Sequence, residues 1–573
     1  MTFPTSDPFN IKTMLFDTVP FDLTSVRTAL IAGSLLIVAL SKFPKMKVPV
    51  QGIPMASNSH WLFGHVKVLV GDFRETWWKL GYERANDDGL CSFWLFSRPM
   101  ITVTRVEHAR AILAASHNRA GSRMKTYMKM FLGENSLPFL NGKEWKHTRT
   151  VYTKALSKSA VTAMTEPIHD IITTMIKSLD RKITENHGHP VDTNMETIFN
   201  LILSDISGKI FFGMDFKCCE TLEQHPITEA IKFLFTEVGR RYKSPFNPAA
   251  RYLCLPTQSN RKFRESVKFI RDTLRDIINE RRQTMLTTPS EKSKRDFITS
   301  ALESLGTEKD TLDIDKVIDI LTTAHTAAFD SSSAALVYIF YCLASNPFAE
   351  NECLKEIDQV MKEGDSFTNQ ERLPYCNAVV TEATRLYPSF ILTMRSLEKP
   401  VTLGNVTVPA GMDVTLPLWH LQRDERNFHR ADEFLPERWV KQNADGSWVD
   451  HLSADDTNKD MMPSRASFSS DDTTLPGSDP NSSDKSTHLN HTSFREQNGH
   501  VRPADKNAFL TFSAGGRSCP GYHLARKELC LITVELLRHF KFELGPGFKL
   551  NPINFAITQK NEGGLPVIIS KRK

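Results

Sequence analysis

The chain has 573 residues, with 71 lysines and arginines against 66 aspartates and glutamates, a formal net charge of +5 at pH 7. Hydrophobic residues make up 40% and charged residues 24%, a composition that excludes collagen-like, coiled-coil and wholly disordered chains. The small charge gives no reason to expect a nucleic-acid partner, and nine cysteines without a CxxC pair exclude a disulfide scaffold and a zinc ribbon. The composition indicates a large, mostly globular protein.

The first unusual segment lies near the N-terminus, where residues 23–43 are almost entirely apolar. A helix needs about 20 such residues to cross a membrane. The leader, residues 1–22, is acidic, whereas Lys42, Lys45 and Lys47 stand at and beyond the end of the segment, a bias that places the rest of the chain in the cytosol. We therefore expect a transmembrane signal anchor, with a cleaved signal peptide or a buried core helix as alternatives.

The next part of the chain carries helical patterns. Residues 150–390 have apolar residues at spacings of three and four, which predicts amphipathic helices. Neither Gly nor Pro occurs between Gly306 and Pro347, which allows one helix of roughly 30 residues. The alternating segment 401–408 predicts a small β-hairpin.

The second unusual segment spans residues 442–506. Between 451 and 500, 26 of 50 residues are Ser, Thr, Asp or Asn. Such a segment buries too little apolar surface to offset its conformational entropy, so we expect a disordered polar insertion on the surface.

A loop with a distinctive residue pattern follows the insertion. Its spaced aromatic, glycine, arginine and cysteine residues are Phe512, Gly515, Arg517, Cys519 and Gly521. Glycines at 515 and 516 allow the backbone to approach a flat ligand. Pro520 suits the first position of a helix, which would stabilise Cys519 as the thiolate that binds metal. Arg517 adds a cation suited to a carboxylate-bearing cofactor, although a lone cysteine is more commonly a buried apolar residue.

This loop resembles the Phe-x-x-Gly-x-Arg-x-Cys-x-Gly signature of the cytochrome P450 (heme-thiolate) family and matches every fixed position. The resemblance is to the eukaryotic microsomal type and covers residues 45–573 apart from the insertion. It implies the cytochrome P450 fold, mainly α with small β-sheets, as one large heme domain at 44–573 behind the N-terminal anchor. It also implies heme b with Cys519 as the axial thiolate ligand of iron.

Other segments match the family in the same order along the chain. Glu382 and Arg385 match its Glu-x-x-Arg helix, and Arg438 matches its Pro-Glu-Arg segment. In the family these three residues form a buried ion triad. Taken alone, the spacing of Glu382 and Arg385 also fits an ordinary surface ion pair.

The resemblance also implies residues that hold the heme besides Cys519. Trp145 and Arg149 match a Trp-x-x-x-Arg helix that contacts the heme propionates, and Arg395 lies where the family often has another propionate-binding arginine. Phe512, Gly515 and Arg517 of the signature complete the predicted cofactor-binding set.

Residues 327–331 of the long helix resemble the family's Ala/Gly-Gly-x-Asp/Glu-Thr segment, with Ala328 in place of Gly and Ser331 in place of Thr. Asp330 and Ser331 retain an acid–alcohol pair, which in the family delivers protons during oxygen activation; a helix with polar residues facing solvent is the alternative. Ser331 lacks the methyl group that restricts a threonine rotamer, so we expect turnover with a larger leak of hydrogen peroxide. Ala327 replaces the glutamate of a subgroup with covalently linked heme, which predicts non-covalent heme.

The resemblance implies a monooxygenase that inserts one oxygen atom from dioxygen into a lipophilic substrate, such as a fatty acid, sterol, terpenoid or xenobiotic. The sequence has no GxGxxG or P-loop pattern. Electrons from NADPH would therefore come through NADPH–cytochrome P450 reductase, with cytochrome b5 as a further donor. Lys146, Arg149 and Lys527 are candidates for a basic docking face, for which plain solvation is an equal explanation. The expected location is the endoplasmic reticulum membrane, single-pass, with the catalytic domain in the cytosol.

Two other functions remain open at this point. A heme-thiolate isomerase or dehydratase would share the fold without using oxygen, and the retention of Asp330 and Ser331 weighs against it. A non-enzymatic heme-binding membrane protein would need no proton relay. The substrate itself cannot be read from one sequence.

Overall fold

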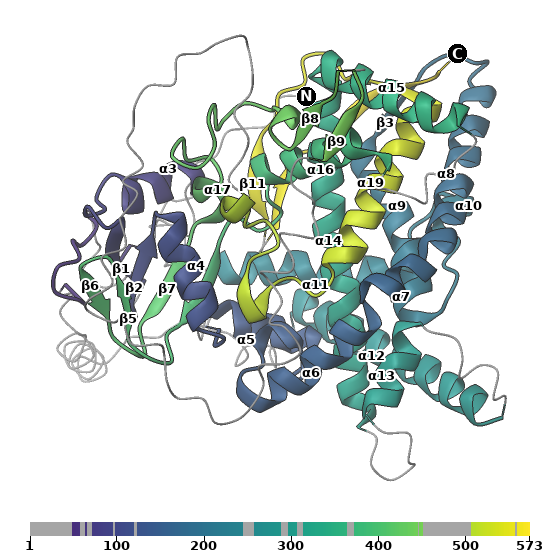
Figure 1. Cartoon of the computed structure of the whole chain (residues 1–573). Coiled ribbons are helices and arrows are strands. Elements are labelled where there is room, and N and C mark those ends of the chain that lie inside the picture. The colour runs from purple at the N-terminus through teal and green to yellow at the C-terminus, as the bar shows by residue number, and fades with distance from the viewer. Residues whose placement is uncertain are drawn as a thin grey trace, which may run out of the picture.

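The computed structural model describes residues 48–572 except for several internal segments: 58–63, 66–71, 96–97, 120–122, 244–256, 288–295, 306–312, 364–371, 445, 451–505 and 556–557. The predicted leader and the transmembrane anchor at 23–43 lie outside the described residues. The described part is mainly helical with small β-sheets, as the resemblance predicts (Figure 1).

The largest sheet has four strands in the order β1-β2-β7-β4 and lies at the left of Figure 1. Its strands are β1 (Leu90–Leu95), β2 (Arg98–Val103), β7 (Asp413–Leu416) and β4 (Thr393–Ser396). β2 and β7 run parallel, while the other two pairs are antiparallel. The pairing of β4 with β7 sets Arg395 opposite Val414, which fixes the place of this arginine in the fold.

The helical body lies at the right of Figure 1. Its principal helices are α5 (Arg123–Leu132), α6 (Gly142–Ala155), α8 (Thr165–Glu185), α9 (Met195–Ser207), α11 (Pro226–Lys243), α12 (Gln258–Thr287), α13 (Phe297–Leu305), α14 (Ile314–Ala344), α15 (Pro347–Lys362), α16 (Pro374–Leu386) and α19 (Tyr522–His539). The helix α4 (Val106–Ala115) lies instead beside the four-stranded sheet.

The helix α14 forms the centre of this body and packs against α9, α16 and α19. It confirms the prediction of one helix of about 30 residues, and the side chain of Asp313 caps its N-terminus by accepting from the backbone N–H of Lys316. Within the described residues it is the one helix long and apolar enough to cross a membrane. However, 72% of its apolar window is buried inside the protein, so its apolar character reflects its place in the core.

Two hairpins bear on the sequence predictions. β5 (Val401–Leu403) and β6 (Val406–Val408) pair antiparallel, which confirms the hairpin predicted over 401–408. A second hairpin, β11 (Pro552–Phe555) with β12 (Thr558–Asn561), packs against α14 near the C-terminus of the chain.

The first residues of the predicted insertion are ordered into a hairpin. β8 (Val440–Gln442) pairs with β9 (Trp448–Asp450), so these strand residues at the start of the predicted insertion do not belong to a disordered segment. The reason is Trp448, whose indole N–H donates to Glu352 at 3.0 Å and whose ring lies 5.0 Å from that of Tyr375. This anchored aromatic supplies the apolar burial that the composition of 451–500 lacks; residues 451–505 lie outside the described part.

Candidate active site

Cys519 lies in the loop between the short helix η10 (Gly515–Arg517) and α19. Its backbone N–H donates to the carbonyl oxygen of Phe512 at 2.8 Å, which closes the loop. The sequence predicts Pro520 at the first helical position, whereas Pro520 and Gly521 form a turn and α19 begins at Tyr522. The turn is favoured because it places the Gly521 amide in hydrogen-bonding position to the cysteine sulfur. Of the eight cysteines in the described residues, Cys519 alone is not buried.

The surroundings of Cys519 act on its thiol in both directions. Burial raises the pKa of the thiol, and the nearby Glu528 raises it further, whereas the Gly521 amide and Arg149 lower it. The amide and the arginine are thus the two groups of this loop that favour the thiolate, the form that binds metal. A metal ion at the sulfur would displace the proton.

The glycines of the loop serve packing within the protein. Gly515 has φ +66°, and a Cβ there would lie 2.3 Å from the carbonyl oxygen of Leu113 at the end of α4. A Cβ at Gly516 would lie 2.5 Å from the ring of His117. At both positions the absence of a side chain thus allows a close approach to the last turn of α4 and to His117 beyond it; the expected approach to a flat ligand stays a prediction.

Arg517 is buried beside this loop. Its guanidinium donates to the carbonyl oxygens of His117 and Leu140, both at 2.6 Å, and to the side-chain oxygen of Asn141 at 2.9 Å. It also lies 4.2 Å from the ring centroid of Trp145, a cation–π contact with one of the predicted cofactor-binding residues.

The helix α6 brings Trp145 and Arg149 to the same place. The two residues are four apart and share one helix face. Trp145 is buried, and Arg149 donates to the carbonyl oxygen of Ser518 at 2.6 Å, directly before Cys519. Arg149 is therefore turned inward, which removes it from the predicted docking face because its charge is engaged by the cysteine loop.

The two remaining members of the predicted docking face lie on different helices. Lys146 is exposed on α6, and Lys527 is half-buried on α19. Both side chains are accessible, as a docking face requires, but accessibility alone identifies no partner, so the docking face stays a prediction.

Arg395 extends from β4 toward the same loop. It is fully buried, and its guanidinium donates to the hydroxyl of Thr393 at 2.9 Å and to that of Ser513 at 3.3 Å. Arg119, which the sequence analysis does not single out, donates to the same Thr393 hydroxyl at 3.2 Å. The Nε atoms of Arg119 and Arg395 are buried and find no hydrogen-bond partner among the described residues.

These four arginines, Arg119, Arg149, Arg395 and Arg517, are defined here as the arginine cluster. Within the described part of the chain none of them forms an ion pair, and their acceptors are neutral oxygens. Burial, with a further contribution from the neighbouring arginines, lowers the pKa of Arg395 to about 8 and that of Arg517 to about 9, since like charges disfavour one another. Glu398 is the carboxylate that partly offsets this repulsion at Arg517.

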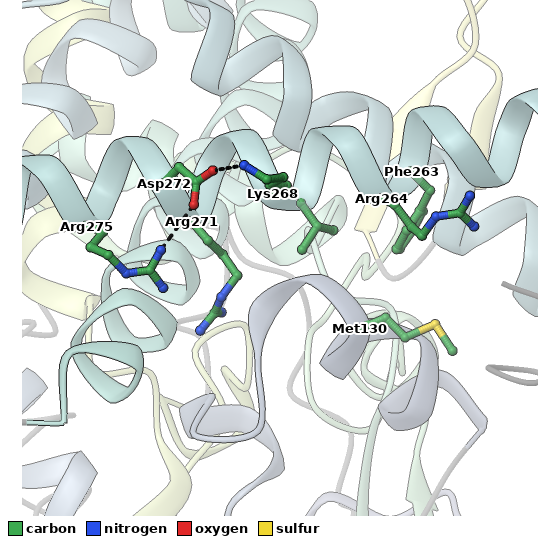
Figure 2. Close-up of a pocket in the computed structure, with 8 residues that line it drawn as sticks. Met130, Phe263, Arg264, Lys268, Arg271, Asp272 and Arg275 are labelled. Carbon is green, nitrogen blue, oxygen red and sulfur yellow. Dashed lines mark hydrogen bonds and ion pairs between the residues drawn. The ribbon is translucent and has the colours of Figure 1, made fainter. Parts of the chain in front are cut away.

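A second group of cations shows what a compensated arrangement looks like. An open cavity of about 350 Å³ lies between α12 and α5, away from Cys519 (Figure 2). Three of its cations are paired: Asp272 bonds both Lys268 and Arg275, and Asp319 and Asp315 raise the pKa of Arg271 although burial alone would lower it.

The arginine cluster therefore fits a ligand with carboxylates. Buried guanidiniums are normally paired with anions, and two Nε–H groups here lack any acceptor among the described residues. Cys519, the one cysteine of the described residues that is not fully buried, lies beside them, next to Arg149. A flat cofactor that binds sulfur through its metal and carries peripheral carboxylates would satisfy both features, and heme has this chemistry.

The predicted triad residues come together in the core. Glu382 accepts from Arg385 at 2.8 and 2.9 Å and from Arg438 at 2.9 Å, and all three are fully buried. The indole of Trp439 donates to the same carboxylate at 2.8 Å. Burial alone raises the pKa of Glu382, but the two arginines and the backbone N–H of Leu435 outweigh it and hold the pKa below its usual range.

The triad connects to the cysteine loop through Gln422. Arg385 donates to the backbone oxygen of Gln422 at 2.5 Å, and the side-chain oxygen of Gln422 accepts from the backbone N–H of Leu510 at 2.8 Å and the hydroxyl of Thr511 at 3.0 Å. Leu510 and Thr511 lead directly into Phe512, so the triad fixes the start of the loop that carries Cys519. Gln422 has no motif that could have marked it in the sequence.

Asp330 and Ser331, the predicted acid–alcohol pair, lie side by side on α14 but form hydrogen bonds in different directions. The carboxylate of Asp330 accepts from Lys560 at 2.8 Å and from the hydroxyl of Thr558 at 2.6 Å. The hydroxyl of Ser331 donates to the carbonyl oxygen of Ala327 at 2.6 Å. Sequence analysis misses Lys560 because only the fold brings β12 to α14.

The accessible face of α14 contains Ser331. Between Val317 and Phe340 every residue is buried except Ala327, Ala328 and Ser331. Ala327, Ala328 and Ser331 thus form one accessible patch on the otherwise buried stretch of α14, and this patch includes the predicted alcohol, Ser331.

The comparisons with known proteins agree with this geometry. The cytochrome P450 family model matches residues 54–463 and 490–565, most of the chain, and passes over residues 464–489 of the polar segment.

Individual relatives are distant. The chain is 24% identical to the protein LUTEIN DEFICIENT 5, chloroplastic, of Arabidopsis thaliana, over 77% of this chain and 65% of that protein. It is 26% identical to cytochrome P450 97B2, chloroplastic, of Glycine max, over 70% and 66% of the two chains. It is 23% identical to cytochrome P450 4X1 of Homo sapiens, over 88% of each chain. The chain thus spans slightly less than two thirds of the two plant relatives.

Proposed function

The chain belongs to the cytochrome P450 family, and we propose that it is a heme-thiolate monooxygenase that inserts one oxygen atom of dioxygen into a lipophilic substrate. The observation that carries this proposal is the partly exposed Cys519 beside an arginine cluster whose charges lack carboxylate partners within the described residues. When bound there, heme supplies the activation of dioxygen, and its cysteinate ligand favours cleavage of the O–O bond.

The cofactor is held from two directions in this proposal. Cys519 would bind the heme iron through its sulfur. Arg119, Arg149, Arg395 and Arg517 would hold the heme propionates and neutralise their charge, and Trp145 of α6 would contact the same groups. Phe512 and Gly515 shape the loop between these groups. Such charge-assisted contacts are stronger than neutral hydrogen bonds and would satisfy the two Nε–H groups that lack partners among the described residues.

Asp330 and Ser331 supply protons to the reaction in this proposal. Their position on the accessible stretch of the central helix supports that role, because the hydroxyl of Ser331 stands beside Ala327 and Ala328 in the one patch of α14 that is not buried. Retention of both groups favours oxygen chemistry over an isomerase or dehydratase, which would need neither.

Electrons come from NADPH through NADPH–cytochrome P450 reductase, with cytochrome b5 as a further donor. We place the protein in the endoplasmic reticulum membrane, single-pass, with the catalytic domain in the cytosol. The support for this location is the apolar segment at 23–43 with lysines at its C-terminal end.

The carbon-monoxide difference spectrum of the reduced full-length protein tests the cofactor. We expect a band at about 450 nm, the mark of thiolate ligation, and its loss in Cys519→Ala. The same spectrum in wild type and Cys519→Ala would contradict the proposed ligand.

Oxygen consumption with purified reductase and NADPH tests the activity. Substrate-dependent oxygen uptake is expected for a monooxygenase, whereas an isomerase, a dehydratase or a heme-binding protein without turnover would show none. A screen of fatty acids, sterols and terpenoids for a change in the spin state of the heme would then identify the substrate class.

A further inference from the structure

Asp330 is held by a strand from the far end of the chain. Lys560 and Thr558 are two residues apart on β12, so their side chains lie on the same face of the strand. The Lys560 ammonium lies 2.8 Å from Oδ1 of Asp330, and the Thr558 hydroxyl donates to Oδ2 at 2.6 Å. Both oxygens of the carboxylate are therefore bonded to β12.

The strand is also fixed against the next residue of α14. The backbone N–H of Gln559, between Thr558 and Lys560, donates to the carbonyl oxygen of Ser389 at 2.8 Å. The hydroxyl of Ser389 in turn donates to the carbonyl oxygen of Ser331 at 2.8 Å. The hairpin β11–β12 is thus bonded directly to Asp330 and, through Ser389, to Ser331.

Lys560 links Asp330 to a more accessible carboxylate. Its ammonium also lies 3.8 Å from Glu196 in the first turn of α9. The exposed fraction of the side chain rises from 11% at Asp330 and 14% at Lys560 to 25% at Glu196. A line of charged groups therefore runs from α14 toward solvent.

The charges around Lys560 keep it protonated. Burial alone would lower its pKa, but Asp330 and Glu196 outweigh burial and raise it. Lys232, on α11, also faces this group, and the pKa of Lys232 is lowered by its own burial and by Lys560, while Glu229 acts in the opposite direction. Lys560 is thus a fixed cation between two carboxylates.

We propose that Lys560 is a positioning residue for proton delivery, which holds Asp330 as a carboxylate bonded to β12 and turned toward Glu196. Asp330 accepts a proton that enters past Glu196, and the ion pair with Lys560 opens as the carboxylate becomes a neutral acid. Asp330 then donates this proton on the Ser331 side of α14 and returns to Lys560 as a carboxylate. The inference rests on the proposed monooxygenase function.

The variants Lys560→Met and Lys560→Arg test the role of the charge. Lys571→Met is the matched control. Lys571, an exposed residue at the end of the strand β13 (Pro566–Lys571), forms an ion pair with Asp180 of α8. Each full-length protein is first tested for the band at about 450 nm and for its thermal unfolding, which shows that heme and fold are intact.

Coupling and its pH profile are the kinetic measurements. Without Lys560 the buried carboxylate of Asp330 loses its cation and is more readily protonated. We therefore expect Lys560→Met to raise the hydrogen peroxide formed per NADPH several-fold and to change the pH dependence of coupled turnover. Lys560→Arg should restore most of the wild-type behaviour, and Lys571→Met should match wild type. Wild-type coupling and pH dependence in Lys560→Met would overturn the proposal.

Infrared difference spectra provide a measurement that does not depend on turnover. We expect Lys560→Met to gain a protonated-carboxyl band at neutral pH that disappears in the double variant with Asp330→Asn. Absence of that band would also overturn the proposal. If wild type showed no oxygen uptake, the monooxygenase function would fail, while the infrared result would still decide whether Lys560 holds Asp330 ionised.

Discussion

The guanidinium of Arg149 donates to the carbonyl oxygen of Ser518 at 2.6 Å, so a side chain from α6 is bonded to the residue directly before the predicted iron ligand. The same cation lowers the pKa of the Cys519 thiol. Arg149 therefore has two effects on the site: it fixes the loop backbone and it favours the anionic form of the sulfur.

Replacing Arg149 with Met should weaken heme binding while the fold is kept. Loss of a hydrogen bond from a charged group costs about 2 kcal/mol, which corresponds to roughly 30-fold in heme affinity. The measurement is the rate at which heme leaves the protein for an excess of a heme acceptor. Lys146→Met, an exposed change on the same helix, is the control and should leave the rate unchanged. Equal rates for the two variants would show that Arg149 has no part in holding the cofactor.

Gly515→Ala separates backbone strain from the close contact with α4. Its φ of +66° is strained for alanine, at about 1 kcal/mol, and its Cβ would lie 2.3 Å from the Leu113 carbonyl oxygen. Gly547, with φ +70° and nothing within 4 Å, carries the strain alone. We expect Gly547→Ala to lower the free energy of unfolding by about 1 kcal/mol and Gly515→Ala to lower it by more than twice as much, with loss of heme. Similar losses in both variants would refute the packing role of Gly515.

The features predicted from the sequence are those set by local spacing. The uninterrupted run after Gly306 predicts α14, and the alternation over 401–408 predicts the β5–β6 hairpin, because each pattern needs only neighbouring residues. The triad differs, because the spacing of its residues does not predict that Arg438 bonds Glu382. Only the motif resemblance groups Arg438 with Glu382 and Arg385.

The residues missed by the sequence analysis depend on tertiary contacts. Arg119 meets the predicted Arg395 at Thr393 only because β4 lies beside the segment after α4, and Lys560 meets Asp330 only because β12 packs on α14. Likewise, no composition rule shows that Trp448 finds a partner in Glu352 and anchors the strand β9.

Glu382→Gln should destabilise the protein strongly, because it leaves Arg385 and Arg438 as buried cations without their anion. Removing one partner of a buried ion pair costs about 3–5 kcal/mol. Glu433→Gln, which removes the exposed partner of Arg430, is the control and should lower the stability far less, because exposed ion pairs contribute little. Denaturant unfolding measures both, and a loss below about 1 kcal/mol in Glu382→Gln would refute the expectation.

The same carboxyl predicts a pH dependence. The pKa of Glu382 is lowered in the folded protein, so its stabilisation is fully present above the unfolded pKa of about 4.3 and is lost as the pH falls through the folded value. Between pH 5 and the acid limit of folding, wild type should lose more stability than Glu382→Gln. Parallel acid profiles would argue against an ionised Glu382.

His325 predicts a second pH dependence, at higher pH. Burial lowers its pKa to about 3, both ring nitrogens lack partners among the described residues, and the ring stacks on Phe212 and Phe329. The unfolded chain binds the proton first, so stability falls as the pH drops below about 6.5, by about 2 kcal/mol at pH 5. His325→Phe should flatten this part of the profile. An unchanged slope between pH 7 and 5 would show that other groups cause it.

Ser331→Thr tests the effect of the smaller alcohol on coupling. The Ser331 hydroxyl donates to the Ala327 carbonyl oxygen, a bond within its own helix that competes with donation toward the accessible face. Threonine adds a methyl group that restricts the side-chain rotamer. We therefore expect less hydrogen peroxide per NADPH in Ser331→Thr than in wild type, measured with saturating reductase, and more in Ser331→Ala, which has no hydroxyl. Ser332→Ala is unsuitable as a control because Ser332 bonds Glu528 on α19. Ser304→Ala on α13 serves instead, because the Ser304 hydroxyl likewise donates to the carbonyl oxygen four residues earlier, and it should match wild type. If Ser331→Thr and wild type formed equal amounts of hydrogen peroxide per NADPH, the rotamer of this hydroxyl would not limit proton delivery. The ion pair between Lys560 of β12 and Asp330 of α14 would then be the group that sets the coupling.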